Sequence, residues 1–435
     1  MGSLIFEHLI HVNEQLLGIQ FNFSEYHKTH LKEYKEKVVF NNLKAPCFKF
    51  HFDPENSVFD TSYYVGVDWL EKQKVALFVE SKLNNTLEVD VLGMLFDSMK
   101  HPENLSHLEG LLHVEYDSPW IEIPNRKDIL SPFLIVQFLS LVKNITRKGL
   151  KKNYYTVKNN LRNKVKGKVL VGEQIKQNVF KNKLTNTVCE YQEFGIDHVE
   201  NQFLNLVIQV TKNYISEHNH LFNGYLNSLN ETIAFCLPAF ENVRLAPRHT
   251  KTVKCTKNTF YPEYSKAIEL GEAILKYLSF NITKANQSTP AVTPPFWIDM
   301  SKLFELYVYG KLKELFSNPN DLSYHDKFKG GKETDILIKA DEFKCVIDCK
   351  YKPKYEDEAP SLKDKRQLAG YTRLKSVYDK LGVDYNEVIR GLIIYSHQSC
   401  KSTISKDDLF SEPIKEYIDF FKLGISLPVI QSLHN

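Results

Sequence analysis

Apolar side chains recur at helical spacing in three stretches of the chain. The pattern predicts a helix over residues 131–149, because Ser131 can cap its first turn, Pro132 suits the first helical position and Gly149 can end it in the left-handed conformation. Two further helices are predicted, one after Glu200 and one after residue 300. Their apolar positions are Phe203, Val207, Val210 and Tyr214 in the former, and Phe304, Val308, Leu312 and Leu315 in the latter.

Shorter apolar runs predict strands at both ends of the chain. Residues 75–79 and 87–91 are predicted strands in a region whose connections are rich in Asn, Asp and Pro, which favours a small α+β domain. Near the C-terminus, residues 334–339 and 343–351 are predicted to pair across Asp341-Glu342. A helix over 364–381, stopped by Gly382, and a buried strand over 388–395 follow.

The order of these elements predicts the fold class and the domain boundaries. A helix, two paired strands, a helix and a strand form the alternating pattern of an α/β domain with a mixed sheet flanked by helices. Residues 285–295 hold three prolines and no large side chain, which marks a boundary. We therefore expect a small α+β domain over 1–125, a helical middle region over 126–285 and an α/β domain over 286–435.

Composition adds limits to this picture. At 435 residues, 43% hydrophobic and 25% charged, the chain is typical of a globular protein of two or three domains. The longest apolar stretch, 133–142, is too short to span a bilayer and the N-terminus lacks the pattern of a leader, so a cytoplasmic protein with no membrane contact is expected. Seven scattered cysteines without a C-x-x-C pair predict buried free thiols rather than a zinc site.

The net charge of +3 conceals a strongly basic block. Residues 143–183 hold thirteen basic residues and a single acid, Glu173, with Tyr154 and Tyr155 between them. Such a block predicts a polyanion partner, and the alternative is a solvated helical face. The residues expected to contact DNA are Lys148, Lys151, Lys152, Arg162, Lys164, Lys166 and Lys168.

Two acids and an amine near the C-terminus form the chemical candidate. Asp348 and Lys350 lie two apart on a predicted strand, so both side chains point to one face. If Asp341 and Glu342 form a two-residue turn, Asp335 lies opposite Asp348 on the partner strand. A longer or bulged turn would shift this register.

This arrangement suits metal-assisted phosphodiester hydrolysis. Mg²⁺ prefers a few carboxylate oxygens together with water and phosphate, so Asp335 and Asp348 are the expected ligands. Lys350 can orient a water or stabilise charge on the phosphate. A surface hairpin with solvated charges is the alternative, but an acid within the apolar run around Asp348 requires a partner.

Three further residues are auxiliary candidates. Gln367 and Tyr371 lie four apart on one helical face, where they could contact the site or the DNA backbone, or form a core Tyr beside a surface Gln. Glu305 is a possible further acid, with a solvent-facing helical Glu as its alternative. The sequence holds no G-x-x-x-x-G-K-[ST] motif, so this chain is not expected to hydrolyse nucleotides, and no G-x-S-x-G elbow.

In these residues the chain resembles the McrC family, the endonuclease partner of the McrB GTPase, whose catalytic domain is of the PD-(D/E)XK type. The stretches that carry the resemblance span about residues 130–395. They are Lys148-Gly-Leu-Lys-Lys-Asn-Tyr154 with Asn160-Leu-Arg162, Lys166-Gly167-Lys168 and Gln174; Cys189-Glu-Tyr-Gln-Glu-Phe194 with Glu200-Asn-Gln-Phe-Leu204; and Asp299-Met300, Leu303-Phe-Glu305, Thr334-Asp335-Ile, Asp348-Cys-Lys-Tyr351 and Gln367 to Tyr371.

The resemblance implies Asp335 and Asp348 as metal ligands and Lys350 as the catalytic lysine. Thr334 stands where the family pattern has Pro, a position that shapes the backbone and donates no ligand. The implied activity is Mg²⁺-dependent DNA cleavage in a restriction system directed to methylated double-stranded DNA, with GTP used by an McrB-like AAA+ partner that residues 1–125 would contact. A system that recognises an unmethylated sequence and a non-catalytic activator of the partner GTPase stay open.

Overall fold

The computed structural model describes residues 62–430 with interruptions, the longest at 282–290, and the backbone of five strands within residues 1–61. The chain forms two compact units, residues 131–286 and residues 1–130 together with 287–435. The boundaries of the first unit lie close to those of the predicted middle region. The division into three domains stays a prediction.

The N-terminal part of the larger unit is built on three sheets, of which the smallest pairs β9 with β13, and one described helix. A five-stranded sheet has the order β1-β7-β6-β14-β8, and a four-stranded sheet has the order β2-β5-β4-β3. Strand β7 confirms the strand predicted over 75–79. The elements are β1 (His8–Asn13), β2 (Ile19–Gln20), β3 (Glu36–Val39), β4 (Phe48–His51), β5 (Val58–Thr61), β6 (Tyr64–Glu71), β7 (Val75–Glu80), α2 (Val91–Met99), β8 (Leu112–Val114) and β9 (Ile121–Ile123).

The strand predicted over 87–91 is wrong. Val89 forms a single bridge with Val429, and helix α2 begins at Val91. Asp90 caps that helix by accepting a hydrogen bond from the backbone N–H of Gly93 at 2.8 Å. The apolar run therefore leads into a helix. The sequence signal that distinguishes it from a strand is Asp90, a capping residue placed three positions before the backbone N–H that it binds.

Strand β14 (Phe296–Asp299) brings the segment that follows the smaller unit into the N-terminal five-stranded sheet, because it pairs with β6 and β8. Gly66 of β6 allows this pairing, since an added Cβ would lie 2.0 Å from the carbonyl oxygen of Phe296. The proline-rich segment predicted as a boundary thus contains strand β13 (Ala291–Thr293), which pairs with β9, and is followed by β14.

The C-terminal part holds a six-stranded mixed sheet with the order β15-β16-β17-β18-β20-β19. Strands β15, β16 and β17 are antiparallel to one another, whereas β17, β18 and β20 run parallel. This agrees with the predicted mixed-sheet α/β domain. The elements are α8 (Met300–Leu315), β15 (Leu322–Phe328), β16 (Lys332–Ile338), the 3₁₀ turn η7 (Asp341–Phe343), β17 (Cys345–Lys350), α9 (Leu362–Tyr371), α10 (Lys375–Leu381), β18 (Arg390–Ser396), η9 (Asp407–Phe410), β19 (Glu412–Pro413) and β20 (Phe420–Ile425).

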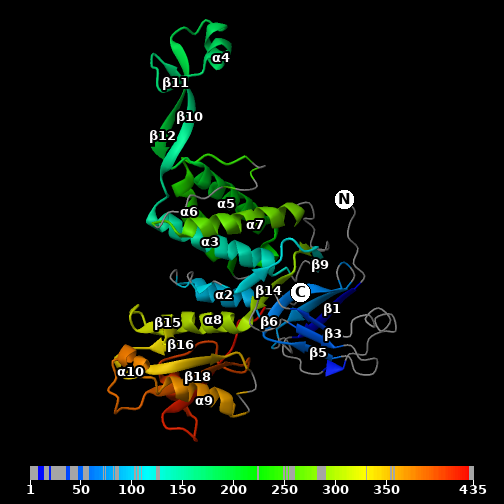
Figure 1. Cartoon of the computed structure of the whole chain (residues 1–435), viewed down its shortest axis with the longest axis vertical. Helices are drawn as coiled ribbons and strands as arrows, with labels where there is room; N and C mark the ends of the chain where they lie inside the picture. Colours follow the sequence, from blue (N-terminus) through cyan, green and yellow to red (C-terminus); the bar gives the residue numbers. More distant parts are fainter. Residues whose placement is uncertain are drawn as a thin grey trace. The chain divides into compact units, whose positions relative to one another are not determined.

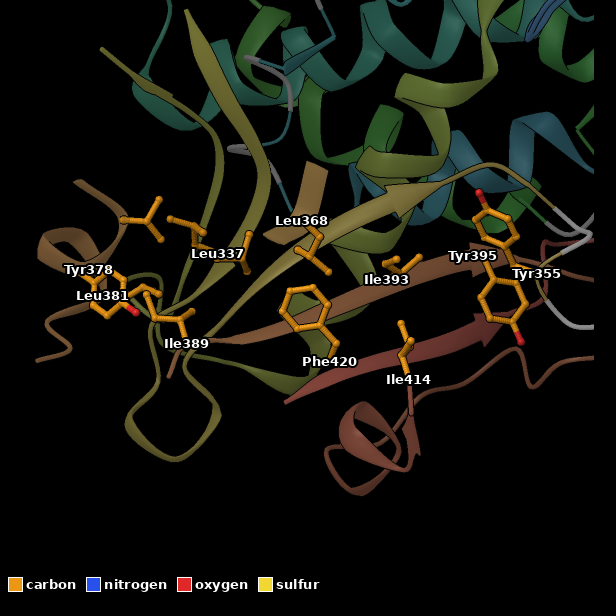
Figure 2. Close-up of a cluster of buried hydrophobic side chains, with 12 residues drawn as sticks. Leu337, Tyr355, Leu368, Tyr378, Leu381, Ile389, Ile393, Tyr395, Ile414 and Phe420 are labelled. Atoms are coloured by element: carbon orange, nitrogen blue, oxygen red, sulfur yellow. The ribbon is translucent and has the colours of Figure 1, made fainter. Parts of the chain in front are cut away.

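The helix predicted over 364–381 is two helices, α9 and α10, separated at residues 372–374. Its end is as predicted, because Gly382 adopts the left-handed conformation with φ 60°. Both helices contribute to a buried cluster that includes Leu368, Val377 and Ile393 (Figure 2). That cluster packs the helices against the sheet, so it fixes α9 beside strand β17.

The smaller unit is a set of helices from which a long strand pair extends (Figure 1). Helix α3 begins at Leu130, so Ser131 lies within its first turn rather than at the cap, and Gly149 follows with φ 88°. Strands β10 and β12 pair along ten residues each, and β11 pairs with β12. The elements are α3 (Leu130–Lys148), β10 (Asn153–Arg162), β11 (Lys168–Val169), α4 (Val171–Gln174), the π-helical turn η3 (Ile175–Val179), β12 (Asn186–Gly195), α5 (Val199–Glu217), η4 (Asn219–Leu221), α6 (Leu226–Cys236), η6 (Leu237–Phe240) and α7 (Glu263–Asn281).

We call residues 153–195 the arm. Most of the basic block lies on the arm, so the alternative of a solvated helical face is wrong for that part of the block. The predicted helical middle region holds helices α3, α5, α6 and α7 together with this strand pair. Tyr154, Thr156 and Lys158 alternate with less exposed residues, which is the period-two pattern of a strand.

Among the described residues the cysteines are free thiols, as predicted. Cys189, Cys236, Cys345 and Cys349 are buried and Cys400 is half-buried, whereas Cys47 and Cys255 lie outside the described residues. Within the described part of the chain no helix is both long and apolar enough to cross a membrane.

Candidate active site

Strands β16 and β17 bring the predicted acids together. Their register pairs Ile336 with Ile347 and Leu337 with Val346, so one further step sets Asp335 opposite Asp348. The connection is the 3₁₀ turn η7 and not a two-residue turn, yet the register is the predicted one. Asp335 Oδ2 also accepts a hydrogen bond from the backbone N–H of Cys349 at 2.8 Å, which holds its carboxylate at β17.

Asp348 and Lys350 form a buried ion pair on one face of β17. Lys350 Nζ donates to Asp348 Oδ1 at 2.8 Å and lies 2.7 Å from Oδ2. Both carboxylate oxygens of Asp348 thus contact the Lys350 ammonium, and the buried Oδ2 makes no hydrogen bond among the described residues. The side chain of Asp348 is fully buried and that of Lys350 is 14% exposed, which excludes the solvated surface hairpin.

Burial and mutual repulsion raise the pKa of both carboxyl groups. Burial raises the pKa of Asp348 to about 7, with Lys350 opposing the shift and Asp335 adding to it. Burial and the nearby Glu305 raise the pKa of Asp335 to about 7 as well. The two acids raise the pKa of Lys350 even though its burial acts in the opposite direction. Two carboxyl groups that face a single ammonium therefore leave a site that lacks positive charge.

Helix α9 places Gln367 beside Lys350 and links it to Tyr371, which also packs against the buried cluster. Lys350 Nζ donates to Gln367 Oε1 at 3.4 Å, and Gln367 Nε2 donates to the Tyr371 hydroxyl at 3.2 Å. The start of α9 is tied to the end of β17, because Asp364 accepts from Lys352 Nζ at 2.6 Å and from the Tyr355 hydroxyl. The helix thus holds Gln367 where it orients the lysine.

The alternative that Glu305 is a solvent-facing residue of a helix is wrong. It lies on α8 with its side chain 14% exposed, and Oε2 is 2.9 Å from His325 Nε2. Burial raises the pKa of Glu305, and its charge acts on Asp335. His325 was missed by the sequence analysis, because strand β15 was not predicted and a lone His carries no local signal.

A family model for the McrBC 5-methylcytosine restriction system component matches residues 64–380, which is most of the chain. The chain belongs to this family. The family resemblance found in the sequence is therefore confirmed, and the match includes the arm and the strands that carry Asp335, Asp348 and Lys350.

Two solved structures are similar to this McrBC family member. A chain in a half-complex from a tetradecameric assembly of Thermococcus gammatolerans McrB AAA+ hexamers with bound McrC is 15% identical, with a TM-score of 0.39 and coverage of 97% of this chain and 95% of that chain. A chain in the Thermococcus gammatolerans McrBC complex is 14% identical, with a TM-score of 0.29 and coverage of 70% and 87%. No curated protein matches the sequence.

The donor set of this McrBC family member fits a hard divalent cation. Asp348 Oδ2 is a buried oxygen without a hydrogen bond, and the excess of carboxylates over ammonium favours an added positive charge. In the described part of the chain no three His, Cys, Asp or Glu side chains are grouped to hold an ion by themselves. Two carboxylates suit Mg²⁺, which keeps several waters and binds through one or two acids, better than they suit zinc.

The residues expected to contact DNA divide into two groups. Lys151 is buried, pairs with Glu200 at 2.7 Å and is therefore not available to a phosphate. Its carbonyl oxygen accepts from Asn201 at 3.0 Å, so it anchors the base of the arm on α5. The others are exposed, with Lys148 paired with Glu263 and Lys166 with Glu193. The exposed set is Lys148, Lys152, Arg162, Lys164, Lys166 and Lys168.

Proposed function

We propose that this chain is the nuclease subunit of a restriction system and cleaves DNA phosphodiester bonds at the site formed by Asp335, Asp348 and Lys350. The observation that carries the proposal is the convergence of a buried acid, a partly buried acid and a partly buried amine on adjacent strands. Burial of an acid is costly, and here two carboxyl groups share a single ammonium, which supports a site that binds a positively charged ligand.

Each of the three residues has a role in hydrolysis. Asp335 and Asp348 would hold Mg²⁺, which when bound polarises a phosphoryl group and lowers the pKa of a coordinated water. The neighbouring acids raise the pKa of Lys350, so its amine stays protonated. It would donate a hydrogen bond to a phosphate oxygen or to the attacking water and stabilise negative charge as it develops. Gln367 limits the positions that Lys350 can take. We propose that these residues form a site of the PD-(D/E)XK type.

The partner and the substrate follow from the family. A 5-methylcytosine restriction system acts on methylated DNA, and this chain is one component of such a system. Because the sequence has no phosphate-binding loop for a nucleotide, GTP would be used by a separate McrB-like AAA+ subunit. Recognition of the methylated base would then lie in the partner, which delivers double-stranded DNA to the nuclease.

The arm supports two kinds of contact. Its exposed Lys and Arg side chains suit phosphates, which position a duplex without specifying its sequence. Near its turn, however, large apolar side chains are exposed, and such a group on a surface is typical of a protein-binding site. These side chains are Val165, Val171, Val179, Phe180 and Leu184. We therefore propose that the basic sides of the arm guide DNA and that its apolar end contacts a protein partner.

Site variants with a matched control test the nuclease proposal. Asp348→Ala and Lys350→Ala should abolish cleavage of methylated plasmid in the presence of partner, GTP and Mg²⁺, while co-purification with the partner is retained. Asp341→Ala in the same hairpin, where the side chain is 94% exposed, should cut normally. Cutting by the Asp348→Ala protein would reject the assigned site.

Two further measurements separate the alternatives. A subunit that only activates its partner would stimulate GTP turnover equally with and without Asp348 and would cut no DNA in either form. A system directed to an unmethylated sequence would cut methylated and unmethylated plasmids alike.

A further inference from the structure

His325 lies in the centre of strand β15 with a backbone conformation that strands do not normally contain. Its φ is 52°, in the left-handed region. The ladder with β16 pairs Tyr324 with Ile336 and Asp326 with Thr334, so His325 is the residue across from Asp335 and is omitted from the pairing. Among the described residues the other non-glycine positions with positive φ lie outside strands. Such a conformation is sparsely populated by residues other than glycine, and it is retained where surrounding contacts enforce it.

Both nitrogen atoms of the His325 ring face carboxylates. Nε2 lies 2.9 Å from Glu305 Oε2 on α8, and Nδ1 lies 3.1 Å from Glu333 Oε1 on β16. The ring also stacks on Tyr324 with centroids 4.1 Å apart, and Tyr324 stacks on Tyr309 of α8 at 4.9 Å. The imidazole is thus fixed on its face and at both of its hydrogen-bonding positions.

These contacts bear on the nuclease site through Glu305. This carboxylate is largely buried and acts electrostatically on Asp335, while His325 is its hydrogen-bond partner at the edge of the sheet. Without that partner, a Glu on a helix has several rotamers and would turn away from the buried acids that repel it. A hydrogen bond from a fixed ring removes that freedom.

We propose that His325 is a positioning residue that holds the Glu305 carboxylate on the Asp335 side of the site, where Glu305 contacts the water shell of the divalent cation without being one of its direct ligands. This inference rests on the proposed nuclease function. The left-handed backbone at His325 serves this purpose, because it takes the side chain out of the regular strand pattern and brings it to Glu305.

Two substitutions separate the two ring contacts. In His325→Gln the amide nitrogen reaches the position of Nε2 and can still donate to Glu305. In His325→Asn the shorter amide reaches only the position of Nδ1, near Glu333, and Asn tolerates the left-handed conformation well. Each variant thus keeps one contact, and thermal unfolding shows whether both are folded.

The decisive measurement is binding of MnCl₂ to the purified full chain by calorimetry, without partner or DNA. Loss of a residue that orients a site acid weakens metal affinity by about 10-fold or more. We expect this loss in His325→Asn and near-normal affinity in His325→Gln. In a Glu305→Gln background the Asn substitution should have no further effect, because the two residues act as a pair.

The outcomes are distinct from those of the nuclease proposal. Equal Mn²⁺ affinity in the Asn and Gln variants, whether normal or reduced in both, would overturn the role assigned to His325. Asp348→Ala tests the site itself: if that variant keeps normal Mn²⁺ affinity and cuts DNA, the nuclease site is wrong irrespective of His325. If Asp348→Ala cuts no DNA while the His325 variants keep normal Mn²⁺ affinity, the nuclease site stands and only the role of His325 is rejected.

Discussion

Two regions of this chain, the β16–β17 strand pair and the arm, hold acids beside lysines, and they differ in how much solvent reaches the charges. On β17, Lys350 and Asp348 are 14% and 0% exposed, whereas on the arm Lys158 and its partner Glu173 are 54% and 42% exposed. A buried pair pays a desolvation penalty that solvated pairs avoid. The arm carries more charges than β17, but its charges are solvated. The comparison teaches that the burial of a charged pair, and not the number of charges, marks the candidate catalytic site.

The comparison is sharpest for cleavage. Lys350→Ala should reduce the rate of DNA cutting by about 10²–10³-fold or more, because it removes a buried donor that acts on developing charge. Lys158→Ala removes an equal charge from a solvated pair on the arm, so it should change DNA affinity at most and leave the rate at saturating DNA within about twofold. Single-turnover cleavage at saturating Mg²⁺ measures both. Comparable losses in the two variants would break the distinction.

Lys151 tests the comparison within the basic block itself. Lys151→Met should lower the free energy of unfolding by about 3–5 kcal/mol, because it leaves the Glu200 carboxylate buried and uncompensated. The neighbouring Lys152 is exposed, and Lys152→Met should have little effect. Chemical denaturation measures both changes. If the pair is the cause, Lys151→Met combined with Glu200→Leu should recover most of the loss.

The Asp348 carboxyl is expected to destabilise the metal-free fold. Its folded-state pKa of about 7 exceeds the unfolded value, so the folded chain binds the extra proton between about pH 4 and 7 and loses stability as pH rises through that window. Asp348→Asn removes the penalty and should stabilise the chain at pH 8 in EDTA by about 1–3 kcal/mol. Thermal unfolding at pH 5 and pH 8 tests this. A variant that is less stable than the wild type at pH 8 would show that the ion pair with Lys350 outweighs the repulsion.

The smallest effect is expected on the arm. Lys164→Gln and Lys168→Gln should leave the melting temperature unchanged within about 1 °C, since both side chains are exposed. If each contacts a phosphate, each substitution should reduce the slope of log affinity against log salt by about 1. Fluorescence titration of a DNA duplex between 50 and 200 mM salt, with the full chain, measures the slope. An unchanged slope would assign these lysines to another partner or to solvation.

The candidate site was largely predictable because its residues are close in sequence. Asp348 and Lys350 share a strand face through the period of two, and Asp335 follows from the short connection that fixes the register. The 3₁₀ turn differs from the predicted turn, but it preserves the pairing of the strands. Local geometry is thus sufficient where a hairpin carries the chemistry.

Residues that come from distant elements were not predictable in the same way. His325 lies on a strand with a weak apolar pattern, and its link to Glu305 depends on how α8 packs beside the sheet. Lys151 was predicted to contact DNA, because sequence cannot distinguish a buried lysine from an exposed one within a basic block. Strand β14 was not predicted to join the N-terminal sheet, since its pairing partners lie more than 180 residues away.

The sequence by itself determined the pair of strands, the register that aligns Asp335 with Asp348, and the family that these motifs represent. Only the tertiary structure decided which charges are buried, because burial depends on packing between segments that are far apart along the chain. It placed Lys151 on Glu200, His325 on Glu305, and most of the basic block on a strand pair whose charges remain in solvent.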